Sequence, residues 1–66
     1  MTTPKVEQIA AEVCTAKELE AFILWNRGAG YRRIADLLGI SFSTARDRVD
    51  RSRRKVTADP RFKEVP

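Results

Sequence analysis

The chain has 66 residues, a net charge of +4, one cysteine and no histidine. This length makes one domain, which buries only roughly 60% of its unfolded surface, so we expect a small core and marginal stability unless a partner helps. A single cysteine excludes an intramolecular disulfide, and a chain without histidine is a poor candidate for a zinc site. We interpret Cys14 as a small buried or boundary hydrophobe.

The sequence carries no apolar run near the roughly 18 residues that span a bilayer, and no signal-peptide block follows its first residues. We therefore expect a cytoplasmic protein that is not inserted in a membrane. Its charge is uneven, because residues 1–30 hold three basic and four acidic side chains, whereas residues 31–66 hold ten and five. Such a basic segment is typical of phosphate binding, although a solvated helix face is the ordinary alternative.

The apolar spacing predicts an all-α, four-helix fold without strands. Residues 1–14 form a first helix, with Pro4 in its first turn and Thr2 or Thr3 as its cap. Its buried stripe consists of Val6, Ile9, Ala10 and Val13.

A capping box formed by Thr15 and Glu18 predicts a second helix from Ala16 to about Arg27. Leu24 and Trp25 widen its apolar arc, either because the first helix packs there or because the patch is left for a partner. We expect the core stripe of this helix to be Leu19, Phe22 and Ile23.

Gly30 is a permissive N-cap for a third helix from Tyr31 to Leu38, and Gly39 ends that helix where the backbone can take a positive φ. Ala35 suits a close approach of two helices. Arg32 and Arg33 occupy the first turn, where the helix dipole disfavours cations, so phosphate neutralisation competes there with a tolerated surface charge.

Ser41 is the natural N-cap of a fourth, long helix over residues 42–56. This arrangement predicts a helix-turn-helix within a domain of residues 15–57, in which the last helix enters a major groove. The inward stripe of the last helix is Ala45, Val49, Ser52 and Val56, and the seam toward the third helix adds Ile34, Leu38 and Ile40.

The exposed N-terminal half of this last helix is the candidate base-reading surface. Arg46 suits guanine O6 and N7, Asp47 a cytosine amino group, and Phe42 a thymine methyl, with Ser43 beside them. Each has an ordinary competitor: Asp47 can pair with Arg51, and Phe42 can fold back as a staple against the third helix. For Asp50 we favour an intrahelical pair with Arg46 or Arg54.

A second group is expected to contact mainly the DNA backbone, since its members flank or follow the base-reading residues. The expected phosphate contacts are Arg32, Arg33, Ser41, Thr44, Arg48, Arg51, Arg53, Arg54 and Lys55.

Residues 58–66 form a tail. Asp59 precedes Pro60 and therefore avoids the helical region, which ends the long helix. The remaining residues look too short for an independent element, and Phe62 is their only anchor. Phe62 either folds back onto the apolar arc near Trp25, crosses to a second subunit or is disordered, with folding back given the most weight.

The capping box of Thr15 and Glu18, the turn at Gly39 with the cap at Ser41, and the basic last helix give residues 15–56 a family pattern. With these features, the segment resembles the C-terminal DNA-binding region of sigma factors, especially the small extracytoplasmic-function type, and more distantly LuxR-type regulators. The resemblance implies promoter reading through the last helix and contact with the flap of RNA polymerase. The chain departs from the family pattern at four positions. It has Gly30 where the family usually has serine, Arg33 where it has glutamate, Ala45 where it has valine or isoleucine, and Ser52 where it has alanine. The matching residues are Thr15, Glu18, Gly28, Tyr31, Ile34, Ala35, Leu38, Gly39, Ile40, Ser41, Thr44, Arg46, Arg48, Arg51, Arg53, Arg54, Lys55 and Val56.

The chain has no room for the sigma region that melts DNA, so a free-standing bacterial or phage regulator is expected. We rank first a sequence-specific double-stranded DNA-binding protein that regulates transcription. The alternatives are an RNA-polymerase-binding adaptor with a sigma-like fold, or a phage DNA-site binder for recombination or packaging. No catalytic group, metal or cofactor is expected, and the protein is expected to be a monomer or weak homodimer.

Overall fold

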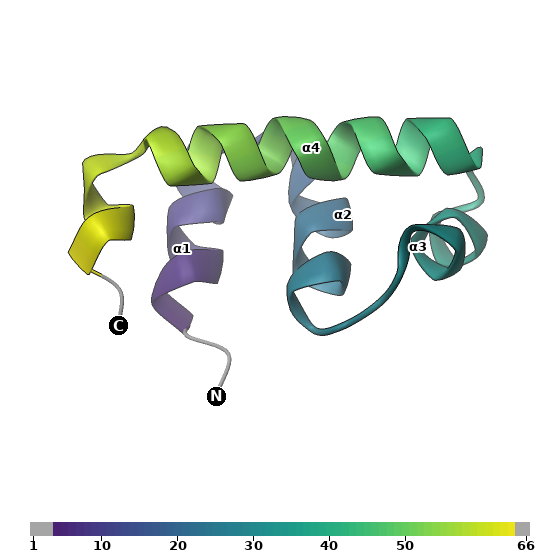
Figure 1. Cartoon of the computed structure of the whole chain (residues 1–66), viewed down its shortest axis with the longest axis horizontal. Coiled ribbons are helices and arrows are strands. Elements are labelled where there is room, and N and C mark those ends of the chain that lie inside the picture. The colour runs from purple at the N-terminus through teal and green to yellow at the C-terminus, as the bar shows by residue number, and fades with distance from the viewer. Residues whose placement is uncertain (1–3, 65–66) are drawn as a thin grey trace.

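The computed structural model describes residues 4–64, which form four α-helices and one short 3₁₀-helix (Figure 1). The described residues contain no strand, so the all-α expectation is confirmed. Helix α4 runs along one edge of the molecule, and the other elements lie on one side of it. The elements are α1 (Pro4–Val13), α2 (Ala16–Asn26), α3 (Tyr31–Leu38), α4 (Phe42–Ala58) and η1 (Pro60–Glu64).

Side-chain caps start the second and fourth helices, as the sequence predicts. The hydroxyl of Thr15 accepts the backbone N–H of Glu18 at 3.3 Å, and the Glu18 carboxylate accepts the N–H of Thr15 at 3.0 Å. Ser41 caps α4 by accepting the backbone N–H of Thr44 at 3.1 Å. Each cap satisfies donors that the helix itself leaves free. The expected caps of α1, Thr2 and Thr3, lie outside the described residues.

The turn between α3 and α4 depends on one left-handed residue. Gly39 has φ of +65° and ψ of +38°, the conformation expected of a glycine that ends a helix. The backbone N–H of Ile40 then reaches the carbonyl of Ala35 at 3.0 Å. The chain therefore reverses tightly enough that only three residues, 39–41, separate α3 from α4.

We expect Gly39→Ala to destabilise the protein by about 1 to 2 kcal/mol, because an L side chain is strained at this φ. An added Cβ meets no atom within 4 Å, so crowding contributes nothing to the loss. Gly30→Ala is the matched control, since Gly30 has a negative φ of −76° and equally open surroundings. Its cost at an N-cap is roughly 0.5 kcal/mol. Urea unfolding checks both, and equal losses would contradict the backbone explanation.

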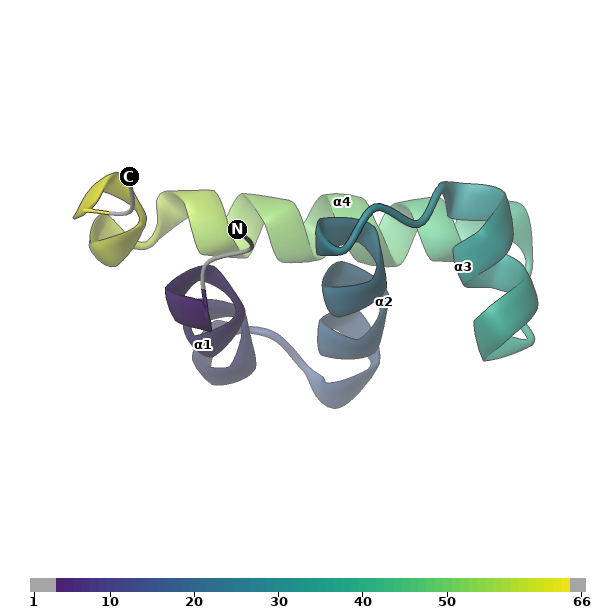
Figure 2. The ribbon, with the colours of Figure 1, turned by 90° about the horizontal axis from the view of Figure 1, so that it is seen from below.

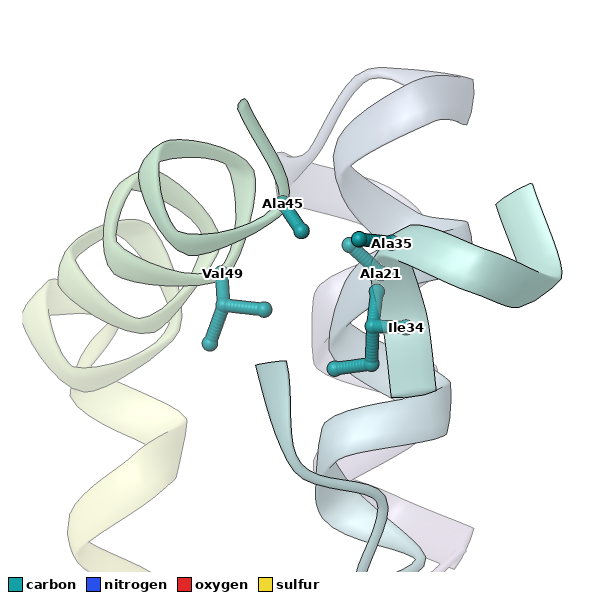
Figure 3. Packing of buried hydrophobic residues seen from close by; sticks show 5 residues of the cluster. All are labelled: Ala21, Ile34, Ala35, Ala45 and Val49. Atoms are coloured by element: carbon teal, nitrogen blue, oxygen red, sulfur yellow. The ribbon is translucent and has the colours of Figure 1, made fainter. Parts of the chain in front are cut away.

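The core consists of two clusters of buried side chains. The turn-side cluster packs α2, α3 and α4 together, and Figure 3 shows Ala45 and Val49 pointing from α4 toward the side chains of the other two helices. Its alanines let these helices approach closely. The turn-side cluster is Ala21, Ile34, Ala35, Ala45 and Val49, and the α1-side cluster is Ile9, Ala10, Phe22 and Val56.

The predicted core stripe of α2 is partly wrong. Phe22 is buried as expected, but Ala21 is fully buried while Leu19 and Ile23 are only half-buried. The reason is that α2 lies between the two clusters, so Ala21 joins one and Phe22 joins the other. Helix α2 therefore buries two adjacent faces, a situation that a single periodic stripe does not represent.

The tail forms η1, so the interpretation that it is too short for an element is wrong. The Asp59 carboxylate accepts the backbone N–H of Arg61 at 2.9 Å and pairs with its guanidinium, which also reaches Glu12 at 2.7 Å. This guanidinium lowers the pKa of Asp59 to about 2. Within residues 4–64, η1 packs beside α4 and α1, and no aromatic contact joins Phe62 to Trp25, so the tail folds back but not onto the apolar arc. Phe62 remains 36% exposed.

Candidate nucleic-acid interface

Helix α4 has one buried face and one solvent-facing face. The expected inward stripe of Ala45, Val49, Ser52 and Val56 is confirmed, because all four residues are buried. Ser52 is tolerated there since its hydroxyl donates to the carbonyl of Val49 at 2.7 Å. Figures 1 and 2 show the remaining elements gathered on this buried side. The outer face of α4 consists of the exposed residues Ser43, Arg46, Asp47, Arg51 and Arg54.

The four predicted base-reading residues lie together in the first turns of α4, and all are exposed. Phe42 takes one of the two roles between which the sequence left it open, the contact with the third helix. Its ring meets the ring of Tyr31 edge-on, with centroids 6.0 Å apart, so it does fold back toward α3. It nevertheless stays 49% exposed, which leaves apolar surface for an outside contact.

The acidic residues of α4 pair within the helix. Asp47 lies 3.1 Å from the guanidinium of Arg51, and Asp50 lies 4.0 Å from that of Arg46. The intrahelical pair favoured for Asp50 is thus present, with Arg46 as its partner. More than half of the Asp47 and Arg51 side chains is exposed, so this pair is weak and exchanges readily for other partners.

Ser41 and Thr44 differ in what they can offer a phosphate. Ser41 donates its hydroxyl hydrogen to the Thr44 hydroxyl at 2.7 Å and accepts the Thr44 backbone N–H. The hydrogen of Ser41 is therefore occupied in the cap, while the hydroxyl hydrogen of Thr44 remains available to an outside acceptor. Of the two expected contacts, Thr44 is the better donor.

The predicted phosphate-contacting cations fall into four environments, the first of which is the intrahelical pair of Arg51 with Asp47. Among the residues that the structure describes, Arg32, Arg33 and Arg54 are exposed and Arg48 is half-buried, and none of these four makes an ion pair. Arg53 instead covers the ring of Trp25, with its central carbon 4.6 Å from the ring centroid. Lys55 is bound to Glu18.

Lys55 has a structural role, because an ion pair holds it against α2. Its ammonium lies 2.7 Å from the carboxylate of Glu18, whose residue is only 8% exposed. The ammonium and the N–H of Thr15 together hold the pKa of Glu18 below its ordinary value, against the opposing effect of burial. Sequence reasoning found the capping role of Glu18 but missed this pair, because 37 residues separate the partners.

We expect Glu18→Gln to destabilise the protein by about 1 kcal/mol at neutral pH, since glutamine keeps an oxygen for Thr15 but loses the charge. The pKa of Glu18 is lowered from 4.5, so its stabilisation is present above that pH and is lost as the pH falls through the lowered value. The variant should therefore lose less stability than the parent as the pH falls below 4.5.

Glu20→Gln is the matched control for this prediction, because Glu20 is an exposed carboxylate on the same helix. The unfolding free energy of the Glu20→Gln variant should equal that of the parent across the pH series. Chemical unfolding at a series of pH values makes the comparison, and identical pH profiles for the Glu18→Gln variant and the parent would refute the role of the pair.

Other polar groups serve packing. The Glu7 carboxylate joins α1 to α2 through a pair of hydrogen bonds from Arg27 at 3.1 and 3.2 Å, and these bonds lower the pKa of Glu7. Burial raises the pKa of the half-buried Cys14 thiol, which behaves as the expected boundary hydrophobe. Over residues 4–64 no cluster of potential metal ligands occurs, and no described helix has the length and apolarity to cross a membrane.

The geometry thus offers a basic helix with one buried face and one exposed face. Comparison of the chain with protein-family models, with curated proteins and with solved structures finds no match.

Proposed function

We propose that this protein is a sequence-specific double-stranded DNA-binding protein that regulates transcription. The main observation behind this proposal is that α4 has two different faces. One face buries Ala45, Val49, Ser52 and Val56, and the outer face presents a run of cations. Six basic and two acidic side chains lie on this one helix. A scaffold that holds a basic helix by one face leaves the other for a major groove.

The dimensions of the molecule support this docking. Helix α4 has 17 residues, a length of about 25 Å, and the molecule measures only 14 Å along its shortest axis. A major groove about 12 Å wide admits one uncovered helix. Figures 1 and 2 place α3 at the end of the molecule where α4 begins, and we assign its exposed Arg32 and Arg33 to the DNA backbone beside the base-reading turns.

The proposed protein acts in the cytoplasm of a bacterium or phage-infected host, as a monomer or weak homodimer. The resemblance of residues 15–56 to sigma-factor regions supports the regulatory role. The alternative function, a polymerase-binding adaptor, requires an exposed apolar surface at Leu24 and Trp25. Both residues are instead half-buried and pack against the core clusters. DNA binding therefore ranks first.

Selection of bound duplexes from a random-sequence pool tests the proposal. At about 0.15 M salt, where nonspecific attraction is screened, we expect one enriched motif, whose symmetry also reports monomer or dimer. If no motif is enriched and binding disappears as the salt concentration rises, the result would contradict sequence-specific DNA binding and favour the polymerase-binding adaptor. A motif tied to recombination or packaging sites would instead favour the phage DNA-site binder.

A further inference from the structure

The single tryptophan of the chain is placed to hold a cation rather than only to fill the core. Trp25 packs against both core clusters, and its ring lies 6.0 Å from that of Phe22 at an interplanar angle of 42°. These contacts with core residues hold the indole ring in one position. Arg53 of α4 lies against the ring, with its central guanidinium carbon 4.6 Å from the centroid. This distance is typical of a cation–π contact.

A guanidinium stacked in this way keeps its hydrogen-bonding capacity. It contacts the ring through its flat face, whereas its five N–H donors lie in its plane and point outward from its edge. Stacking therefore restricts the movement of Arg53 without using its donors. For a long, exposed side chain this restriction removes part of the entropy that binding an anion would otherwise cost.

The surroundings of Arg53 suit one phosphate group. Arg53 lines a shallow, open hollow together with Asp50, Arg54 and Thr57. Two guanidiniums outweigh one carboxylate there, and Arg46 lies 4.0 Å from that carboxylate. The Thr57 hydroxyl donates to the backbone carbonyl of Arg53 at 2.8 Å, so its hydrogen is not available to a ligand. The arginines are thus the donors of this hollow.

We infer that Trp25 is a positioning residue that holds the guanidinium of Arg53 for a single DNA phosphate beside α4. The inference rests on the proposed function only in that the ligand is the DNA backbone; it requires no sequence preference. It also assigns Arg53 and Arg54 different behaviour, although both are exposed arginines of one helix, because only Arg53 is stacked.

A double-mutant cycle on the full-length chain tests the inference with one fixed duplex over a series of salt concentrations. Arg53→Ala should reduce the slope of log affinity against log salt by about one unit. Trp25→Phe should weaken binding by about 2-fold, because the smaller ring holds the guanidinium less firmly and binding must then restrict more of its movement. In the Arg53→Ala background, Trp25→Phe should change the affinity no further. In the Arg54→Ala background, the matched control, it should keep its full effect.

Two further measurements protect the test from a merely structural effect of Trp25→Phe. Arg53→Lys keeps the charge and leaves the core intact, and it should weaken binding about 2- to 5-fold because the flat stack is lost. In the free protein, Arg53→Ala should shift the emission of Trp25 by uncovering its ring, whereas Arg54→Ala should not. Unfolding midpoints of all variants identify a temperature at which each is folded.

Several results would overturn the inference: an equal effect of Trp25→Phe with and without Arg53, parental affinity in the Trp25→Phe or Arg53→Lys variant, or unchanged emission after Arg53→Ala. Failure of the proposed function looks different. Binding without sequence preference would refute the sequence-reading function while the cycle still supported the role of Trp25. A protein that binds no duplex at any salt concentration would refute both.

Discussion

Ala35→Leu is expected to destabilise the protein by about 1 to 3 kcal/mol, a large share of the stability of so small a domain. Ala35 is 6% exposed and belongs to the turn-side cluster with Ala21 and Ala45. A leucine there has no space unless α3 moves away from its neighbours, which would also displace α4. Urea or thermal unfolding measures the loss, and DNA binding should fall with it.

Ala11→Leu provides the control for this overpacking effect. Ala11 is exposed within α1, and alanine and leucine have similar helix propensities, so this substitution should change the unfolding free energy by less than about 0.5 kcal/mol. Comparable stability of the Ala35→Leu variant and the parent would mean that the helices of the turn-side cluster are not packed as closely as the structure has them.

Arg46→Ala is expected to reduce discrimination at one base pair by about 1 to 3 kcal/mol, because a bidentate contact to guanine O6 and N7 is worth this much against the wrong base. Arg46 lies in the exposed first turns of α4, and its pair with Asp50 spans 4.0 Å. That loose pair leaves the guanidinium free to turn toward a base. Affinities for the selected duplex and its single-base variants measure the effect.

Arg54→Ala separates base reading from general attraction. Arg54 is exposed near the C-terminal end of the same helix, and its loss should weaken binding to every duplex alike while reducing the salt slope by about one unit. If Arg46→Ala shows the same uniform loss, direct base reading by Arg46 is wrong and that residue is one more backbone contact.

The starts of α2 and α4 and the end of α3 could be predicted because their signals are local, whereas α4 continues two residues beyond the predicted 42–56. The Thr15–Glu18 capping box and the Ser41 cap lie within three residues of the donors they satisfy, and Gly39 has the left-handed conformation that its position requires. The inward stripe of α4 follows from helical spacing alone. These features need no knowledge of distant parts of the chain.

The features that the sequence did not predict depend either on contacts between residues far apart in the chain or on residues with little hydrophobic signal. Alanine gives little hydrophobic signal, so Ala21 was missed although it is fully buried. The partners of Lys55 and Arg53 come from α2, and no spacing rule connects residues so far apart in the chain. The docking of η1 likewise depends on Glu12, 49 residues before Arg61. Sequence identified the basic helix, but only the fold distributes its cations among structural and available roles.

The most direct test of α4 as the DNA-binding element maps amide chemical shifts of the labelled protein during titration with the selected duplex. We expect the changes to concentrate in residues 31–33 and 41–54, with the exposed side of α1 and η1 little affected. Changes concentrated on α1 and η1, with residues 41–54 unmoved, would contradict the assignment of the outer face of α4 as the DNA-reading surface.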